Sequence, residues 1–141
     1  MPDVTKLIEQ EHREVEALFQ SFKESGDTAL VSKICDELDA HAAAEEEAFY
    51  PAVRDDVPSG KKLAGEAHAE HSEARQLIGR LRRSSDPDHV RELVDELEQA
   101  VSHHVEEEEN DMLPRARDAL GEDRLVAIGS AYQFAKARAQ G

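Results

Sequence analysis

The chain has 141 residues, a length typical of one domain with one hydrophobic core, and we expect residues 1–141 to form a single domain. Its formal net charge of −15 argues against nucleic acid or an anionic membrane as a partner, because both repel such a surface. No apolar stretch approaches the ~20 residues of a membrane span and no signal peptide is visible, so we expect a cytoplasmic protein.

The first two predicted helices form a hairpin. Asp3 can cap a helix over residues 4–24, and His12 falls on its apolar stripe, four residues after Ile8. Ser25-Gly26-Asp27 ends that helix and caps a second one over residues 28–51. Its apolar stripe continues through His41 and Glu45, and Pro51 should kink or end it.

The third and fourth predicted helices repeat this arrangement over residues 61–83 and 87–119. His71 lies on the apolar stripe of the third helix, among small alanines. His104 and Glu108 lie on that of the fourth, which Pro114 should bend. Gly121 separates a short last helix over residues 122–139. The sequence therefore predicts an all-α, up-down-up-down antiparallel four-helix bundle with an extra C-terminal helix.

Two repeats relate the hairpins. The stretch from His41 to Pro51 recurs from His104 to Pro114 at an offset of 63 positions, each copy reading His-x-x-x-Glu-Glu before two apolar residues and proline. Glu11-His12 recurs as Glu70-His71 at an offset of 59. Because residues four apart on a helix share a face, each longer copy directs an imidazole and a carboxylate to the same point. The bundle should have approximate two-fold symmetry.

Six polar residues thus fall on inward stripes. They are His12, His41, Glu45, His71, His104 and Glu108. Burying them without partners would be very costly, so we expect a metal centre in which two carboxylates bridge two cations and four imidazoles complete the ligand set. Nitrogen and carboxylate ligands with an open position suit iron, with manganese or zinc as alternatives. The one cysteine, Cys35, lies away from these stripes, which argues against an iron–sulfur cluster.

The pattern resembles the haemerythrin-like family of HHE cation-binding domains. The resemblance rests on the two His-x-x-x-Glu-Glu stretches, on Glu11-His12 and on His68-Ala69-Glu70-His71, and it covers the four bundle helices. It implies that the six residues hold an oxo- or hydroxo-bridged di-iron pair. Oxygen-carrying members have His-x-x-x-His in the third helix, whereas this chain has His68-x-x-His71. The match is closer to a bacterial H–HxxxE–H–HxxxE subgroup, which favours redox chemistry or sensing over oxygen carriage.

Two functions remain open. The first is a non-haem di-iron protein that binds or reduces a small oxidant, namely dioxygen, hydrogen peroxide or nitric oxide, with a catalase-like or nitric-oxide-directed enzyme as its catalytic form. The second is a non-catalytic oxygen or iron sensor, or a metal-binding module. A purely structural acidic bundle would leave the buried carboxylates unexplained. We expect a small-molecule ligand and a monomer or weak homodimer.

Several neighbouring residues carry separate expectations. Glu46 and Glu47 should face solvent, as should His89 and His103. His68 either reaches the metal or a ligand, or lies at the rim. Tyr50 either packs near the site or, as we favour, in the core or at the rim. Tyr132 should dock the last helix, and Cys35 should be inert.

Overall fold

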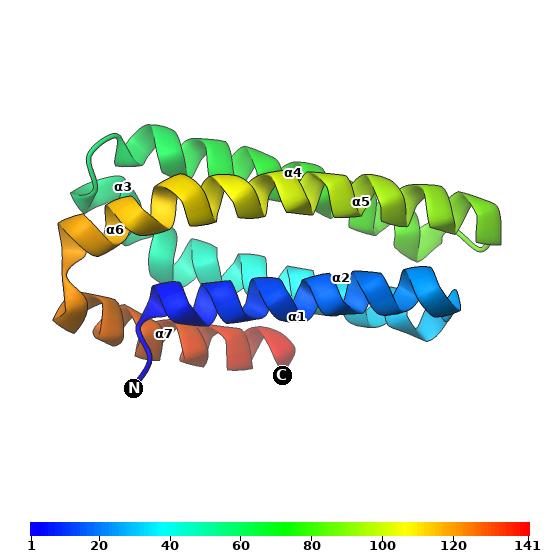
Figure 1. Ribbon diagram of the computed structural model, residues 1–141, viewed down its shortest axis with the longest axis horizontal. Coiled ribbons are helices and arrows are strands. Elements are labelled where there is room, and N and C mark those ends of the chain that lie inside the picture. Colours follow the sequence, from blue (N-terminus) through cyan, green and yellow to red (C-terminus); the bar gives the residue numbers. More distant parts are fainter.

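The computed structural model describes residues 1–141 as a bundle of long antiparallel helices without strands (Figure 1). The α-helices and the two π-helical turns, η1 and η2, follow the order α1 (Val4–Ser25), α2 (Thr28–Ala44), η1 (Glu45–Phe49), α3 (Tyr50–Asp56), α4 (Gly60–Arg83), α5 (Pro87–Glu107), η2 (Glu108–Met112), α6 (Leu113–Leu120) and α7 (Glu122–Gln140). The α2–η1–α3 and α5–η2–α6 segments each form one continuous arm. The predicted up-down-up-down four-helix bundle with an added C-terminal helix is confirmed.

Local sequence signals fix the ends of the first hairpin. Asp3 accepts a hydrogen bond from the backbone N–H of Lys6 at 3.0 Å and so caps α1, as predicted. Gly26 ends α1 in the left-handed conformation, with φ of 68°, which only glycine adopts without strain. Asp27 then caps α2 through the N–H of Ala29. The turn between the helices is therefore encoded in three consecutive residues.

Two π-helical turns replace the simple bends predicted at Pro51 and Pro114. In η1 the N–H of Tyr50 bonds to the carbonyl of Glu45, and in η2 the N–H of Leu113 bonds to that of Glu108. The chain then continues as α3 and α6 beyond each proline. Proline is tolerated there because it lies in the first turn of the following helix, where a backbone donor is not needed.

The core is divided into two apolar clusters. One contains Phe49, Tyr50 and Leu113 near the α3 and α6 end, and the other contains Phe19 and Leu97 near the α1–α2 turn. The predicted metal-site residues belong to neither cluster. On α1, for example, His12 lies between Ile8 of the first cluster and Val15 of the second. A polar layer therefore crosses the bundle between two apolar ones.

The last helix covers only one of the two hairpins. α7 lies along α1 and α2, whereas α4 and α5 are on the other side of the bundle (Figure 1). Its buried residues are Leu125, Gly129, Tyr132 and Ala135, and Ile128 packs against the same apolar cluster. The pseudo-two-fold symmetry of the bundle is broken at this point.

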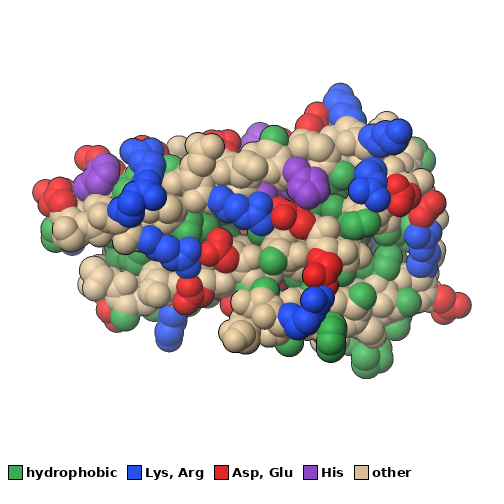
Figure 2. All heavy atoms as spheres, turned by 180° about the vertical axis from the view of Figure 1, so that it is seen from behind, with side chains coloured by type: hydrophobic (Ala, Val, Ile, Leu, Met, Phe, Trp, Pro, Cys, Tyr) green, Lys and Arg blue, Asp and Glu red, His purple; other side chains and the backbone are tan.

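The surface is highly charged and has little apolar area in large side chains. Basic and acidic side chains lie next to one another over the face seen in Figure 2, and Arg82 bonds to both Asp36 and Asp39. The large hydrophobic residues that are exposed are Met1 and Phe134. None of the helices combines the length and apolar character needed to cross a bilayer.

The tight approach between α3 and the start of α4 leads to a stability prediction. A Cβ atom at Gly60 would lie 1.8 Å from the carbonyl oxygen of Val53. Gly60→Ala should therefore lower the free energy of unfolding by more than about 2 kcal/mol, measured by urea denaturation. Gly65→Ala is the matched control in the same helix, because nothing lies within 4 Å of the added methyl group. It should stabilise by up to ~1 kcal/mol. Equal effects of the two substitutions would contradict the close approach.

Candidate metal centre

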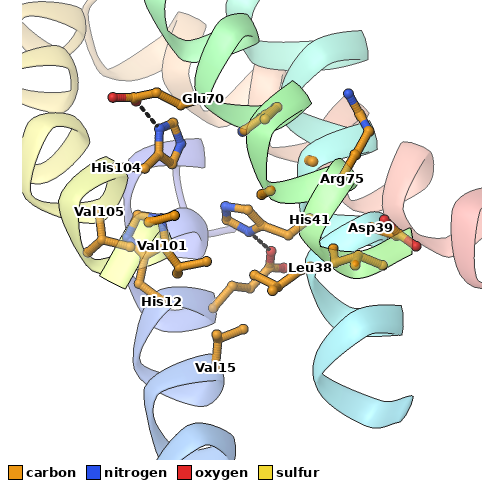
Figure 3. A pocket seen from close by; sticks show the side chains of 16 residues that line it. His12, Val15, Leu38, Asp39, His41, Glu70, Arg75, Val101, His104 and Val105 are labelled. Atoms are coloured by element: carbon orange, nitrogen blue, oxygen red, sulfur yellow. Dashed lines mark hydrogen bonds and ion pairs between the residues drawn. The ribbon is translucent and has the colours of Figure 1, made fainter. Parts of the chain in front are cut away.

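Four imidazoles converge in the polar layer, each from a different helix. His12 comes from α1, His41 from α2, His71 from α4 and His104 from α5, and all four are less than a tenth exposed. Figure 3 shows His12, His41 and His104 pointing toward a common space. Glu45 and Glu108 are buried among them. The structure thus brings together all six residues that the sequence analysis selected.

Each inner carboxylate contacts imidazoles from both hairpins. Oε1 of Glu45 lies 3.1 Å from Nε2 of His41 on its own arm and 3.1 Å from Nε2 of His71. Glu108 repeats this geometry. Its Oε2 lies 3.2 Å from Nε2 of His104, and its Oε1 lies 3.0 Å from Nε2 of His12. Both carboxylates are therefore placed between pairs of imidazoles, as bridging ligands would be.

The other ring nitrogen of every histidine contacts a further glutamate. The Nδ1 pairs are His12 with Glu109 at 2.7 Å, His41 with Glu11 at 2.8 Å, His71 with Glu46 at 2.6 Å, and His104 with Glu70 at 2.6 Å. Figure 3 marks two of them with dashed lines. A carboxylate at Nδ1 holds the N–H there and leaves the Nε2 lone pair for a metal.

The prediction that Glu46 faces solvent is wrong. Its side chain is 22% exposed and bonds to both His71 and Arg75. Its repeat partner Glu109 does the same with His12 and Arg13. The sequence contained the required signal, because the second glutamate of each Glu-Glu pair repeats at the same offset of 63 as the first. Glu47, by contrast, is exposed as predicted.

Tyr50 packs in the core, as favoured by the sequence, and its hydroxyl also reaches the centre. Its ring lies in an apolar cluster, and its hydroxyl lies within hydrogen-bond distance of Glu45 Oε1, at 3.0 Å, and of Glu108 Oε2, so it can donate its one proton to either carboxylate. The same oxygen lies 3.2 Å from Nε2 of His71 and 3.3 Å from Nε2 of His104. The position 63 residues later is Leu113, so the second arm has no counterpart of this phenol.

Tyr132 docks α7 as predicted and also reaches the centre. Its hydroxyl donates to Glu11 at 2.6 Å and lies 3.1 Å from Nδ1 of His41. The ammonium of Lys136 lies 2.9 Å from the other oxygen of Glu11. α7 therefore supports one of the four imidazoles through a buried carboxylate.

The remaining histidines lie outside the centre. The side chains of His89 and His103 are 45% and 67% exposed, which confirms the prediction that they face solvent. His68 is 51% exposed, and its closest carboxylate is Glu46 at 3.9 Å, so the structure favours the rim position. Cys35 is buried, and burial raises the pKa of its thiol to about 11, which fits an inert residue.

Unsatisfied buried atoms test whether the centre suits a cation. Nε2 of His12, Nε2 of His41, Oε2 of Glu45 and Oε1 of Glu108 are buried and make no well-aligned hydrogen bond. Nε2 of His12 lies 3.0 Å from Oε1 of Glu108, and Nε2 of His41 lies 3.1 Å from Oε1 of Glu45, but neither contact has hydrogen-bond geometry. Each such group costs about 1–3 kcal/mol when left unpaired. All four atoms are ordinary ligands of a divalent metal, and they lie around one point. The donor set therefore fits metal ions.

The titration of the centre leads to the same conclusion. Burial opposes a charge on His41, but Glu45 and Glu11 outweigh it and raise the pKa of His41 to about 10. Burial opposes a charge on Glu45 as well, but His41 and its other partners hold the pKa of Glu45 well below its usual range. The carboxylates thus demand positive charge, which protons supply when metal is absent.

An apolar cavity of about 40 Å³ lies against the imidazoles. Apart from the histidines, Glu11 and Glu70, its wall includes Val15, Leu38, Ala74 and Ile78, while Asp39 and Arg75 are at its edge in Figure 3. Neither Glu45 nor Glu108 lines it. One water molecule occupies about 10–15 Å³ of such a cavity, so this cavity can hold only a very small molecule.

The glutamates at Nδ1 give a prediction about metal affinity. Glu46→Gln removes the negative charge beside His71, and loss of such a partner typically weakens metal binding by about 10–100-fold. Competition with a chelator of known affinity would measure the change. Glu47→Gln is the matched control, because Glu47 is adjacent but pairs with Arg138 on the surface. An equal loss in both variants would contradict the assigned contact.

Together, the fold and the site define a four-helix-bundle metal-binding domain. A family model described as Hemerythrin HHE cation binding domain matches residues 3–116, and the chain belongs to this family. The structure is similar to that of a Hemerythrin HHE cation binding domain-containing protein from Mycobacterium kansasii, with a TM-score of 0.85 and 23% identity over 100% of this chain and 89% of that one. This likeness supports the fold.

Two curated relatives also align with almost the whole chain. A protein named DNA nickase from Nostoc sp. is 29% identical over 147 residues, which cover 98% of this chain. An uncharacterized hemerythrin-like protein from Schizosaccharomyces pombe is 22% identical over 96% of this chain. The chain spans only 40% of the length of the first and 70% of the second.

Proposed function

We propose that this chain is a non-haem di-iron protein that binds or reduces a small oxidant, namely dioxygen, hydrogen peroxide or nitric oxide. The observation that carries the proposal is the set of buried, unpartnered imidazole and carboxylate atoms around one point. Nitrogen and carboxylate ligands favour iron over magnesium or calcium, and manganese and zinc are the alternatives to test. Bound iron would supply the one-electron chemistry that protein side chains lack.

The proposed ligand sets follow the contacts. His12 and His41 would hold one ion, and His71 and His104 the other. Glu45 and Glu108 would be shared, because each contacts one imidazole of either pair. The hydroxyl of Tyr50 contacts both shared carboxylates. Among the four imidazoles, it contacts those of the second set, His71 and His104. This ligand set would leave at least one ion with fewer than six ligands, and so with a position for a small molecule.

The remaining groups of the site orient ligands and restrict water. The glutamates at Nδ1 fix the direction of each imidazole, and the apolar cavity beside the rings admits only small molecules. Tyr50 can hold a proton at its hydroxyl oxygen, because burial and then the charges of Glu108 and Glu45 raise its pKa well above the usual range. No side chain stands out as a general base.

A second candidate is a non-catalytic oxygen or iron sensor, and one contact favours it. Tyr132 connects α7 to His41 through Glu11. Loss of metal from His41 would remove the group that this network orients, and α7 could then loosen. Hydrogen exchange that increases in α7 on metal removal, with no turnover of any oxidant, would favour the sensor.

The net charge and the surface composition bear on the partners and the oligomeric state of the chain. A net charge of −15 repels phosphate, so we propose that this chain does not itself bind nucleic acid or anionic membranes, although one relative is named a DNA nickase. A cytoplasmic location remains part of the proposal. The scarcity of large exposed hydrophobic side chains supports a monomer or weak homodimer.

One experiment separates the candidates. Protein purified anaerobically would be assayed for metal content, then exposed in turn to dioxygen, peroxide and nitric oxide while its visible spectrum is recorded. We expect two iron ions per chain and a spectral change with at least one oxidant. Rapid, repeated consumption of peroxide or nitric oxide would establish an enzyme. A single stoichiometric change would favour a sensor, and a fully loaded protein with one ion or none would contradict the dinuclear proposal.

A further inference from the structure

The last helix reaches the metal centre through two side chains that are one helical turn apart. Tyr132 and Lys136 share the face of α7 that is turned toward α1 and α2. Tyr132 is fully buried, and the side chain of Lys136 is only 14% exposed, which is rare for a lysine. Because an ammonium group is costly to bury without a partner, the contacts of Lys136 must offset that cost.

Both side chains hold the carboxylate of Glu11. The hydroxyl of Tyr132 donates to Oε1 at 2.6 Å, and the ammonium of Lys136 lies 2.9 Å from Oε2. Oε1 also lies 2.8 Å from Nδ1 of His41, a contact marked in Figure 3. Each oxygen of Glu11 thus has a donor from α7, which fixes the carboxylate in one orientation. The direction in which Nε2 of His41 points therefore depends on α7.

Glu11 differs from the other three glutamates that contact an Nδ1 atom. Its side chain is 11% exposed, against 19% to 22% for Glu46, Glu70 and Glu109. Glu46 and Glu109 each pair with an exposed arginine of the bundle itself. Glu70 is the counterpart of Glu11 in the second hairpin, and its further partner is the exposed imidazole of His103 at 3.6 Å. Only Glu11 is held from outside the four bundle helices.

The candidate ligands separate by hairpin in the same way. His12 and His41 come from the first hairpin, and His71 and His104 come from the second. α7 packs on α1, α2 and η1, with α4 and α5 on the other side of the bundle (Figure 1). The residues matched by the family model end at 116, before α7 begins. This helix is therefore placed to affect one pair of imidazoles and not the other.

We propose that Tyr132 and Lys136 are positioning residues of the metal centre. They act through Glu11 on the imidazole of His41, and so strengthen the binding of the ion at His12 and His41 alone. The inference rests on the proposed function, in which two ions are bound. It assigns to the C-terminal helix the affinity of one of these ions, whereas the six inner residues provide the ligands of both.

Removal of a single hydroxyl group tests the inference. Tyr132→Phe keeps the ring in its apolar cluster and removes the donor to Glu11. Protein loaded anaerobically with Co²⁺ would be titrated with a chelator of known affinity while its visible absorption is recorded. The matched control is Glu37→Gln, because Glu37 is the other partner of Lys136 and does not contact an imidazole.

We expect Tyr132→Phe to weaken the binding of one of the two Co²⁺ ions by about 10-fold. This is the lower end of the range for a group that contacts a ligand directly, because the hydroxyl acts one contact further away. The other ion should keep its affinity. The absorption of the weakened ion should change as well, since a reoriented imidazole alters the geometry around the metal. Lys136→Gln should weaken the same ion, and it replaces Tyr132→Phe if that variant does not fold.

A double substitution tests whether the effect passes through Glu11. Glu11→Gln/Tyr132→Phe should bind Co²⁺ no more weakly than Glu11→Gln alone, because residues in one chain of contacts are not additive. Fully additive losses would show that the hydroxyl of Tyr132 does not act through Glu11, and would overturn the inference.

Three other outcomes also contradict it. If both ions are weakened equally, α7 supports the whole domain and not one ligand. If neither ion is weakened, or if Glu37→Gln weakens the same ion to the same extent, the contacts with Glu11 have no specific role, although the metal centre stands. A wild-type protein that binds one Co²⁺ ion or none overturns the dinuclear proposal together with this inference.

Discussion

His104→Ala is expected to lose at least one metal ion per chain, whereas His103→Ala keeps its full metal content and visible spectrum. Nε2 of His104 faces Glu108 inside the bundle, and the neighbouring imidazole of His103 is 67% exposed and pairs with Glu107. Adjacent residues on a helix point about 100° apart, so only one of the two can reach the centre. Metal analysis after gel filtration, with helix content checked by circular dichroism, would measure the result.

The two carboxylates provide the same contrast. Glu108→Ala should lose metal because Glu108 contacts imidazoles of both hairpins, and Glu107→Ala should retain it. Stability changes in the His103 and Glu107 variants should stay within about 0.5 kcal/mol, as is usual for surface positions. Metal loss in His103→Ala together with retention in His104→Ala would mean that α5 presents the opposite face to the bundle interior. The assigned centre would then be wrong.

Metal removal is expected to lower the melting temperature by about 10 °C or more. A ligand that binds only the folded protein at 1,000 times its Kd contributes about 4 kcal/mol, and each kcal/mol shifts the melting temperature of a domain of this size by roughly 2–4 °C. The unpartnered atoms of the centre add to the effect, since metal removal leaves them unsatisfied. Thermal unfolding before and after dialysis against a chelator, and again after reloading, would measure it.

The pH dependence of the melting temperature distinguishes metal binding at His41 from protonation of its imidazole. In the metal-free protein the raised pKa of His41, about 10, gives stability that is complete below pH 6.5 and is lost as the pH rises through 10. Metal requires the neutral imidazole, so its affinity grows over the same range. The difference between the two melting temperatures should therefore widen from pH 7 to pH 9. A constant difference would show that His41 does not exchange a proton for metal.

The sequence predicted the bundle and the inner residues because both depend on helical periodicity. His41 and Glu45 are four residues apart, and so are His104 and Glu108, so each pair shares a helix face whatever the packing of the bundle. The repeats then indicated that the two hairpins face each other. The starts of α2 and α5 were also predictable, since Asp27 and Pro87 are strong helix-start signals.

The periodicity of a single helix does not predict contacts between the two hairpins. Glu46 turns away from the stripe of its own arm and still binds His71, because the neighbouring helix α4 brings that imidazole to it. The contacts of the Tyr50 hydroxyl were not predicted, for a different reason. In a regular α-helix a residue five positions after Glu45 points about 140° away from it, and no pattern in the sequence marked the π-helical turn.

The two π-helical turns have a consequence for how the halves of this domain could diverge. Both arms contain the same π-helical turn, which begins at Glu45 or Glu108, so the residue that follows it, Tyr50 or Leu113, is presented from the same kind of turn. The halves of a duplicated ancestor would then become chemically distinct by exchange of a single side chain, without any change in main-chain path. Deleting one residue from either turn would instead restore a regular helix and rotate everything beyond it by about 100°. Insertions and deletions should therefore be far rarer within these ten residues than substitutions at Tyr50 or Leu113.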